Sequence, residues 1–205
     1  MRKDGQAMSK GTLLVLSGPS GSGKGTLVDA YMKKYEDIFL SISATTRDPR
    51  EGEREGVNYF YISEEEFLAK RDENGFLEHA EFCGHYYGTP RDRAEKALNE
   101  GRDVILEIDI QGGFQVKENC PDAVLVFTIP PTFEILKERL IGRGTESMEV
   151  VEKRLARARE EIKLAPKYDY LIINGEIDKA VEDLRAIFDA EKCEIKNNLE
   201  FLKEF

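Results

Sequence analysis

The stretch that decides the fold reads LLVLSGPSGSGKGT and occupies residues 13–26. Its first residues are a short apolar run, typical of a buried strand, and residues 18–24 fit the pattern G-x-x-x-x-G-K. We expect a helix from about Lys24 to about Tyr35. Glycines at such a turn let successive backbone N–H groups face phosphate oxygens, and the helix N-terminus adds a favourable dipole. The stretch therefore predicts a phosphate-binding loop rather than a flexible glycine-serine turn.

One position of this loop departs from the usual pattern. A serine or threonine normally follows the lysine and ligates magnesium, whereas this chain has Gly25 and then Thr26. We expect Lys24 to reach the β- and γ-phosphates of a nucleoside triphosphate, and Thr26 to touch a phosphate. Magnesium would then be held by phosphate oxygens, waters and a distant carboxylate.

The rest of the chain alternates apolar runs with amphipathic stretches, which indicates an α/β fold with a mainly parallel central sheet between layers of helices. The expected strands are 38–43, 104–108, 124–129 and 170–173. The expected helices are 132–143, 148–165 (stopped by Pro166) and 177–205. Between residues 44 and 90 the pattern changes to a strand at 57–62 and a short helix opened by a capping box at Ser63. We interpret this part as an inserted subdomain.

These elements suggest one domain with two appendages. Residues 1–10 are expected to be a flexible tail, with Met1 and Met8 both open as the start, and residues 11–205 to form the domain. Its core would comprise 11–43, 91–142 and 166–205, the insert about 44–90, and a small helical lid about 143–165.

Composition narrows the class of protein. The chain has 205 residues, 40% hydrophobic, and a net charge of −10, which argues against a broad nucleic-acid surface. No run approaches the ~20 apolar residues that a membrane span needs, and no signal peptide is visible. Three widely spaced cysteines without C-x-x-C argue against zinc or disulfides and favour a cytoplasmic protein. The sequence leaves open whether the protein is a monomer or a homo-oligomer.

Cationic residues are nevertheless concentrated in two places. Arg47 and Arg50 lie in a loop stiffened by Pro49, and guanidinium groups bind phosphate through charge-assisted hydrogen bonds worth ~1.5–3 kcal/mol each. With a phosphate loop upstream, we expect a second phosphate site rather than solvated charge. A second set surrounds the turn at residues 142–144 and comprises Arg139, Arg143, Arg154 and Arg157. Ion pairing with nearby glutamates is the alternative for these, and for Arg157 it is the preferred interpretation.

The strand expected at 104–108 leads into two acids, Glu107 and Asp109. Alternate strand residues face the same side, and the carboxyl ends of parallel strands border the ligand crevice. Both carboxylates should therefore face the ligand, with ordinary capping of the strand end as the alternative.

From Ser43 to Glu53 the chain resembles the GMP-binding signature of guanylate kinases, with TTRDPREGE at 45–53. Tyr59, FLE at 76–78 and YYGT at 86–89 follow in that family's order and spacing, and the resemblance runs from about Leu13 to the end of the C-terminal helix. It implies a three-layer P-loop kinase fold with an inserted GMP-binding subdomain and a helical lid. It also implies the reaction ATP + GMP = ADP + GDP, with Mg²⁺, in purine nucleotide metabolism and GMP recycling, by direct in-line transfer.

The resemblance further implies a role for individual residues. The ATP site would comprise Gly18, Pro19, Ser20, Gly21, Ser22, Gly23, Lys24, Gly25, Thr26 and Asn174, although loop capping is an equal alternative for Asn174. The GMP phosphate would meet Ser43, Arg47, Arg50, Tyr59 and Tyr87, and the guanine would meet Glu78, Thr89 and Glu107. The lid arginines Arg139, Arg143 and Arg154 would close over the triphosphate and act in catalysis with Lys24 and Arg47. Asp109 would join the magnesium shell through water. The family often has aspartate where Glu107 stands.

The chemistry of guanine supports this assignment independently. Its N1–H and 2-amino group form a donor pair that one carboxylate, such as Glu78, can accept, whereas adenine offers no such pair. A site built on these hydrogen bonds can discriminate by ~10⁴ or more. We expect ATP and GMP as partners, dGMP as a possible substitute, and neither nucleic acid nor membrane.

Two rival functions remain to be weighed. A kinase-like interaction module that binds phosphopeptides would typically have a damaged phosphate loop, whereas Lys24 and Asp109 are present here. A kinase for another small phosphorylated acceptor would not need Glu78 together with Thr89.

Overall fold

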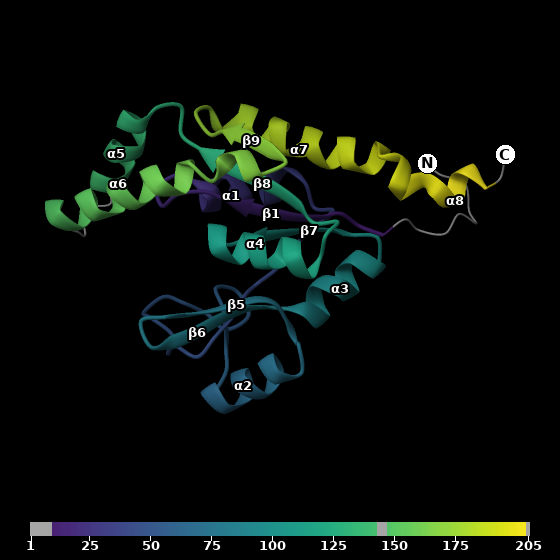
Figure 1. The fold of residues 1–205 in the computed structure, drawn as a ribbon, viewed down its shortest axis with the longest axis horizontal. Coiled ribbons are helices and arrows are strands. Elements are labelled where there is room, and N and C mark those ends of the chain that lie inside the picture. The colour runs from purple at the N-terminus through teal and green to yellow at the C-terminus, as the bar shows by residue number, and fades with distance from the viewer. Residues whose placement is uncertain (1–9, 143–146, 204–205) are drawn as a thin grey trace.

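The computed structural model describes residues 10–142 and 147–203. Within these residues the central sheet has five parallel strands in the order β2-β7-β1-β8-β9 (Figure 1). The strands are β1 (Leu13–Ser17), β2 (Ile38–Leu40), β7 (Asp103–Glu107), β8 (Val124–Ile129) and β9 (Tyr170–Ile173). The register places Leu16 beside both Glu107 and Val126, so the carboxyl ends of the three inner strands meet at one edge.

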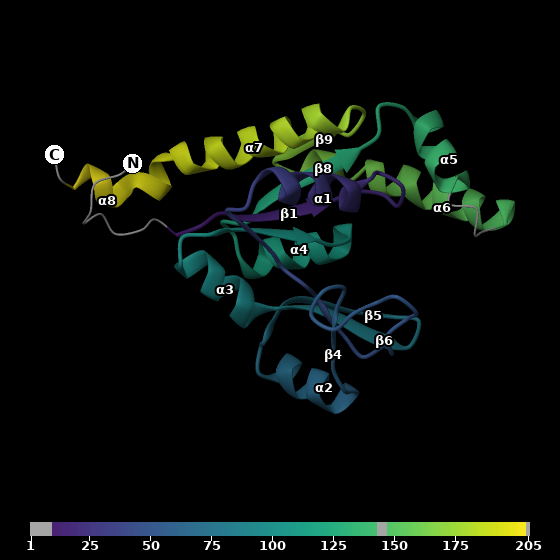
Figure 2. The same cartoon turned by 180° about the vertical axis from the view of Figure 1, so that it is seen from behind.

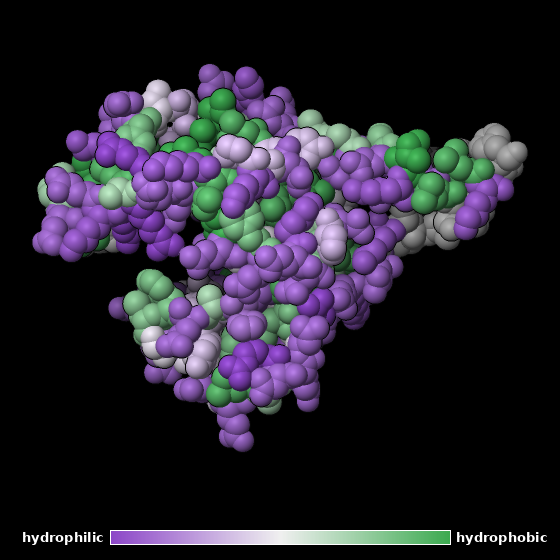
Figure 3. Space-filling view, viewed as in Figure 1, coloured by the Kyte–Doolittle hydropathy of each residue, from purple (hydrophilic) through white to green (hydrophobic). Residues whose placement is uncertain are grey.

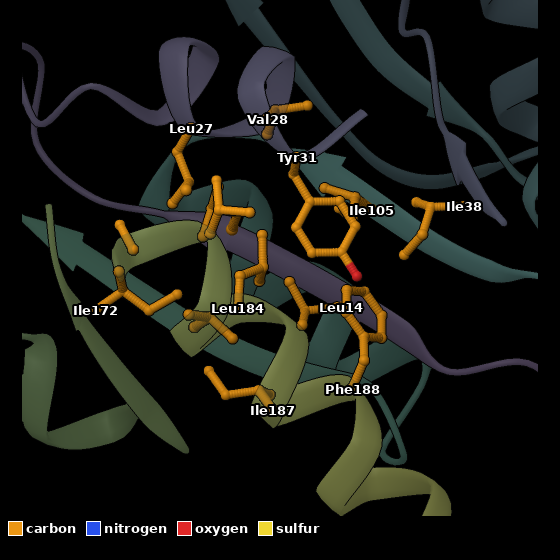
Figure 4. Close-up of a cluster of buried hydrophobic side chains, with 14 of the residues drawn as sticks. Leu14, Leu27, Val28, Tyr31, Ile38, Ile105, Ile172, Leu184, Ile187 and Phe188 are labelled. Carbon is orange, nitrogen blue, oxygen red and sulfur yellow. The ribbon is translucent and has the colours of Figure 1, made fainter. Parts of the chain in front are cut away.

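Helices cover both faces of this sheet, because every second residue of β1 points to the opposite side. Leu14 and Leu16 pack against α1 (Lys24–Lys34) and α7 (Ile177–Cys193), in the cluster that Figure 4 shows with Tyr31, Leu184 and Phe188. Leu13 and Val15 pack in the other direction, in a cluster that holds buried residues of α3 (Arg91–Asn99) and α4 (Ile110–Asn119). The expected three-layer α/β architecture is confirmed.

The chain between the second and third strands of the core forms a second sheet of its own, in the order β4-β3-β6-β5. Its strands are β3 (Ala44–Thr45), β4 (Phe60–Tyr61), β5 (Phe76–Phe82) and β6 (His85–Pro90), and α2 (Glu64–Asp72) packs beside them. The rings of Phe67 and Phe76 stack at 4.4 Å. Figures 1 and 2 show this insert projecting from the side of the core that carries α3 and α4.

Two further helices lie at one end of the molecule, α5 (Phe133–Ile141) and α6 (Met148–Ile162) (Figure 1). Their buried side chains, among them Leu136, Leu140 and Val151, form a small cluster of their own. α5, which the sequence assigned to the core, thus packs with the expected lid. None of the helices that the structure describes is both long and apolar enough to cross a membrane.

Several expected boundaries are wrong. The strand expected at 38–43 ends at Leu40, because the chain there leaves the core sheet to enter the insert, and the strand expected at 57–62 is reduced to β4. The helix expected at 148–165 ends at Ile162, and Pro166 lies in a short 3₁₀ turn, Ala165–Lys167.

The helix expected to run to the C-terminus ends at Cys193 and is followed by a 3₁₀ turn (Ile195–Asn198) and α8 (Leu199–Leu202). Glu194 is extended, and the amides of Asn197 and Asn198 donate to the carbonyls of Glu191 and Lys192. Asparagine side chains that compete for backbone carbonyls in this way favour the end of a helix.

Candidate active site

The phosphate loop lies between β1 and α1, as its sequence predicts. Gly23 has a φ of 85°, and a Cβ added there would lie 2.6 Å from Nδ2 of Asn174, so only glycine fits. Lys24 Nζ donates to the carbonyl of Gly18 at 2.7 Å and to that of Pro19 at 3.4 Å. The lysine therefore lies across the loop whose amides would surround a phosphate.

Two predicted site residues, Asn174 and Arg139, bind the backbone carbonyls of this loop. Asn174 is only 3% exposed, and its Nδ2 donates to the carbonyls of Ser22 and Gly23, each at 3.0 Å. Arg139 donates to the carbonyl of Ser22 at 3.3 Å and to that of Asn174 at 2.9 Å. Of the two roles considered for Asn174, these contacts favour capping of the loop.

A cleft of about 690 Å³ opens in front of the loop. Lys24, Thr26, Glu107 and Asp109 line it from the core, and Arg154 lines it from α6. Figure 3 shows the hollow between the two lid helices and the insert. The structure thus brings the phosphate loop, both strand-end acids and one lid arginine to one place.

The lid arginines differ in their contacts. Arg154 donates to Ser20 Oγ at 3.2 Å, which links α6 to the loop. Arg157 pairs with Glu161 at 2.7 Å, as expected for a salt-bridging residue, but both side chains also line the cleft. Arg143 lies outside the described residues.

The predicted GMP phosphate site lies on the insert, and its residues are not among those that line the cleft. Arg47 is bound by both carboxylate oxygens of Glu53, at 2.9 and 3.0 Å, and its guanidinium lies 5.5 Å from the ring centre of Tyr59. The rings of Tyr59 and Tyr87 meet edge to face at 6.0 Å. Burial raises the pKa of Tyr59 above its usual value, so its hydroxyl, already protonated at neutral pH, stays a proton donor over a wider pH range.

The remaining two members of the predicted GMP phosphate site are Arg50 and Ser43. The guanidinium of Arg50 is exposed and makes no hydrogen bond or ion pair with the residues that the structure describes, while its backbone N–H donates to Glu53 at 2.8 Å. Ser43 accepts a backbone hydrogen bond from Phe60 at 2.9 Å, at the junction of core and insert.

The predicted guanine-binding pair is buried. Thr89 Oγ1 donates to Glu78 Oε1 at 2.7 Å, and the two residues are 1% and 7% exposed. Burial raises the pKa of Glu78 to about 7, the Thr89 hydroxyl opposes the shift, and the charge of Asp109 adds to it. The carboxylate is thus shielded from water and needs hydrogen-bond donors, which is the environment that recognition of a base requires.

Glu107 and Asp109 both line the cleft, although they reach it differently from the way the strand pattern suggested. β7 ends at Glu107, and Asp109 is the N-cap of α4, accepting from the N–H of Gly112 at 2.8 Å. A Cβ added at Gly112 would lie 3.0 Å from Glu78 and 3.4 Å from Asp109, so these two carboxylates share one region. The absence of a side chain at Gly112 makes room for the carboxylate of Glu78.

Glu107 faces the phosphate loop instead of the base-reading pair. A Cβ added at Gly25 would lie 3.5 Å from its Oε1. Desolvation raises the pKa of Glu107, the charge of Lys24 lowers it, and Asp29 raises it again. We expected Glu107 at the guanine and Asp109 at the magnesium ion. The structure favours the opposite assignment, because Asp109 lies beside Glu78 and Glu107 lies beside Lys24.

The sequence did not identify several residues of the site, among them Glu53, Asp29, Phe82 and Glu161. Glu53 is the last residue of the signature TTRDPREGE at 45–53. Its position six residues after Arg47, in an arginine-rich loop, could have indicated an ion pair with Arg47. Asp29, one turn after Gly25 on α1, could have been found from helical periodicity. Phe82, 62% exposed near the tip of the β5–β6 hairpin, lines the cleft from the insert, and no sequence signal points to it.

The residues of the cleft fit a magnesium ion that arrives with a nucleotide. Among the described residues no group of three or more acidic, histidine or cysteine side chains could hold a metal alone. Glu107 and Asp109 are among the carboxylates that line the cleft, together with Lys24. Mg²⁺ typically takes one or two carboxylates and completes its shell with waters and substrate phosphates, so this donor set suits it.

Comparisons with known proteins agree with the geometry. Residues 10–191 match the family model described as Guanylate kinase. A guanylate kinase of Clostridium perfringens is 50% identical over 96% of this chain and 91% of its own length. One from Caldanaerobacter subterraneus is 52% identical over 92% of each chain. The crystal structure of guanylate kinase from Anaplasma phagocytophilum superposes with a TM-score of 0.73 at 34% identity, covering 91% of this chain and 89% of that one.

Proposed function

The chain belongs to the guanylate kinase family and phosphorylates GMP with ATP, and we propose that it does so by direct in-line transfer with Mg²⁺, as a step of purine nucleotide metabolism and GMP recycling in the cytoplasm. The observation that supports the proposed acceptor site best is the buried Glu78–Thr89 pair beside Asp109, because Asp109 also lines the cleft of the phosphate loop. The proposed guanine-binding residues and the phosphate loop that would bind ATP thus lie close to the same edge of the central sheet.

On the donor side, the loop amides and Lys24 would bind the ATP phosphates, with Thr26 at a phosphate oxygen. Asn174 and Arg139 keep the loop in shape through the carbonyls of Ser22 and Gly23. A loop that is held before ATP arrives needs no reorganisation during transfer, which is how electrostatic preorganisation lowers a barrier.

On the acceptor side, Arg47, Arg50, Tyr59, Tyr87 and Ser43 would bind the GMP phosphate. Both carboxylate oxygens of Glu53 accept from Nη2 of Arg47, which orients the guanidinium before GMP binds. No general base is required, because the phosphate of GMP is already an anionic nucleophile near neutral pH. We propose that Glu78 and Thr89 read the guanine with Asp109, the residue that lies beside them, and that Glu107 serves the metal.

Magnesium bound with ATP would neutralise charge on the phosphate oxygens. Arg154 would add positive charge at the transferring group from α6, with Arg143 as its expected companion. The phosphate loop belongs to the core, whereas Arg47 belongs to the insert. The ATP site and the GMP site must therefore approach each other for transfer, and we propose that the insert closes towards the core. Closure would exclude water from the transferred group.

The experiment that tests the proposal is an ADP-release assay with ATP and Mg²⁺ over GMP, dGMP, AMP, CMP and UMP. We expect GMP to be preferred over AMP by at least about 10³ in kcat/KM. The dGMP rate shows whether the ribose 2′-hydroxyl is used. Faster turnover of AMP would refute the role of Glu78 while leaving the phosphate loop untouched.

A further inference from the structure

Two departures from the usual sequence pattern meet at one point of the cleft. Gly25 stands where a phosphate loop commonly has serine or threonine, and Glu107 is one methylene longer than aspartate. In the structure a Cβ added at Gly25 would lie 3.5 Å from Oε1 and 3.6 Å from Oε2 of Glu107. The carboxylate therefore faces position 25 with both oxygens, at van der Waals distance.

A Cβ at position 25 would already be in van der Waals contact with the Glu107 carboxylate. An oxygen attached to a Cβ at position 25 would extend one bond further and compete with the Glu107 carboxylate for the same space. An aspartate at position 107, in contrast, would withdraw the carboxylate and leave the space beside Gly25 empty. The two positions are therefore complementary in size, although they lie on different elements, α1 and β7.

The same space is also chemically suited to one ligand. Glu107, Lys24 and Thr26 line the same cleft, so a carboxylate oxygen here would be available to a phosphate-bound metal, as the loop hydroxyl is in other phosphate loops. Carboxylate and hydroxyl oxygens are both hard ligands that Mg²⁺ accepts.

We infer that Glu107 supplies from β7 the oxygen ligand that a serine or threonine after the lysine supplies in other phosphate loops, and that Gly25 is required to make room for it. The inference rests on the proposed magnesium role. It predicts that residues 25 and 107 are coupled: the pair Ser and Asp should work, as Gly and Glu do, whereas each mixed pair should fail.

The test is a double-mutant cycle with Gly25→Ser, Glu107→Asp and the double variant. Mg²⁺ is titrated calorimetrically into full-length enzyme saturated with a non-hydrolysable ATP analogue. Each single variant should bind Mg²⁺ about tenfold more weakly than wild type, and the double variant should return to within about threefold of it. Analogue binding in EDTA and thermal unfolding show that each variant is folded and binds nucleotide.

Two matched variants separate ligation from packing. Gly25→Ala combined with Glu107→Asp fills the space without a hydroxyl, so it should not recover Mg²⁺ affinity. Gly25→Ser should likewise fail to rescue Asp29→Asn, an acid of the same cleft. Additive single effects, or rescue by alanine or of Asp29→Asn, overturn the inference. Failure of the wild-type enzyme to bind Mg²⁺ with the analogue would instead refute the proposed metal site on which it rests.

Discussion

The hydroxyl of Thr89 donates to the carboxylate of Glu78 at 2.7 Å, in a pocket where both residues are almost fully buried. One oxygen of the carboxylate is occupied by this contact, and the other lies towards Gly112 and Asp109. The hydrogen bond fixes the orientation of the carboxylate before a base arrives.

Glu78→Gln should abolish the preference for guanine. The amide replaces one acceptor with a donor, so it faces the N1–H and 2-amino donors of guanine with a mismatch. We expect kcat/KM for GMP to fall by about 10²–10³, corresponding to the loss of one charged hydrogen bond and an unpaired buried donor. Steady-state kinetics with GMP and AMP measure it, and Glu81→Gln, exposed on the same strand, is the control. Unchanged GMP kinetics would remove Glu78 from the base site.

The stability of the protein should depend on pH through Glu78. Its pKa is raised from 4.5 to about 7 in the folded state, chiefly by burial. The folded protein then binds the proton more tightly than the unfolded chain, so stability falls as the pH rises through this window. Relative to Glu78→Gln, the wild type should lose up to about 3 kcal/mol between pH 5 and pH 8. Urea unfolding at both pH values tests this, and a pH-independent difference would contradict it.

Glu53→Gln should weaken GMP binding although Glu53 faces no proposed ligand directly. The neutral amide removes the negative charge and one of the two oxygens that accept from Nη2 of Arg47 at 2.9 and 3.0 Å. We expect KM for GMP to rise roughly tenfold with little change in KM for ATP, as for loss of one well-placed charged contact. Glu51→Gln, an exposed acid of the same loop, should behave as wild type. Equal effects of the two variants would show that only loop charge matters.

Asn174→Ala should loosen the phosphate loop. It leaves the carbonyls of Ser22 and Gly23 without their amide donor. We expect the free energy of unfolding to fall by about 1–3 kcal/mol and ATP affinity to fall with it, while GMP affinity stays constant. Denaturant unfolding and equilibrium binding provide the measurements, with Asn99→Ala, an exposed asparagine at the end of α3, as the control. A normal stability with weaker ATP binding would instead favour direct contact with the nucleotide.

Arg154→Ala should slow turnover more than it weakens GMP binding. The side chain lines the cleft and contacts Ser20 of the loop at 3.2 Å, where the proposed mechanism would develop charge on the transferring group. A cation supplied there is worth roughly 10³–10⁵ in rate in related reactions, so kcat should fall by at least about 10². Lys153→Ala, which removes an exposed pair with Glu149, is the matched control. Wild-type turnover in Arg154→Ala would mean that the lid assignment is wrong.

Local sequence was sufficient for the phosphate loop and for several strands, although not for the ends of every helix. The apolar run before Gly18 and the glycines after it predicted β1, the loop and α1, because strand, turn and helix preferences act over a few residues. Strands 124–129 and 170–173 were also predicted to the residue. The buried partnership of Glu78 and Thr89 was anticipated only through the resemblance, since nothing in the local pattern pairs them.

What the sequence by itself determined was the phosphate loop, the three-layer architecture and which charged residues are expected to bind two phosphate groups. The tertiary structure alone decided which carboxylate meets which partner: Asp109 beside Glu78, and Glu107 beside Gly25. It also placed Arg139 and Asn174 behind the loop. These pairings join residues that are distant along the chain, and their geometry depends on strand register and helix packing, which no local preference encodes.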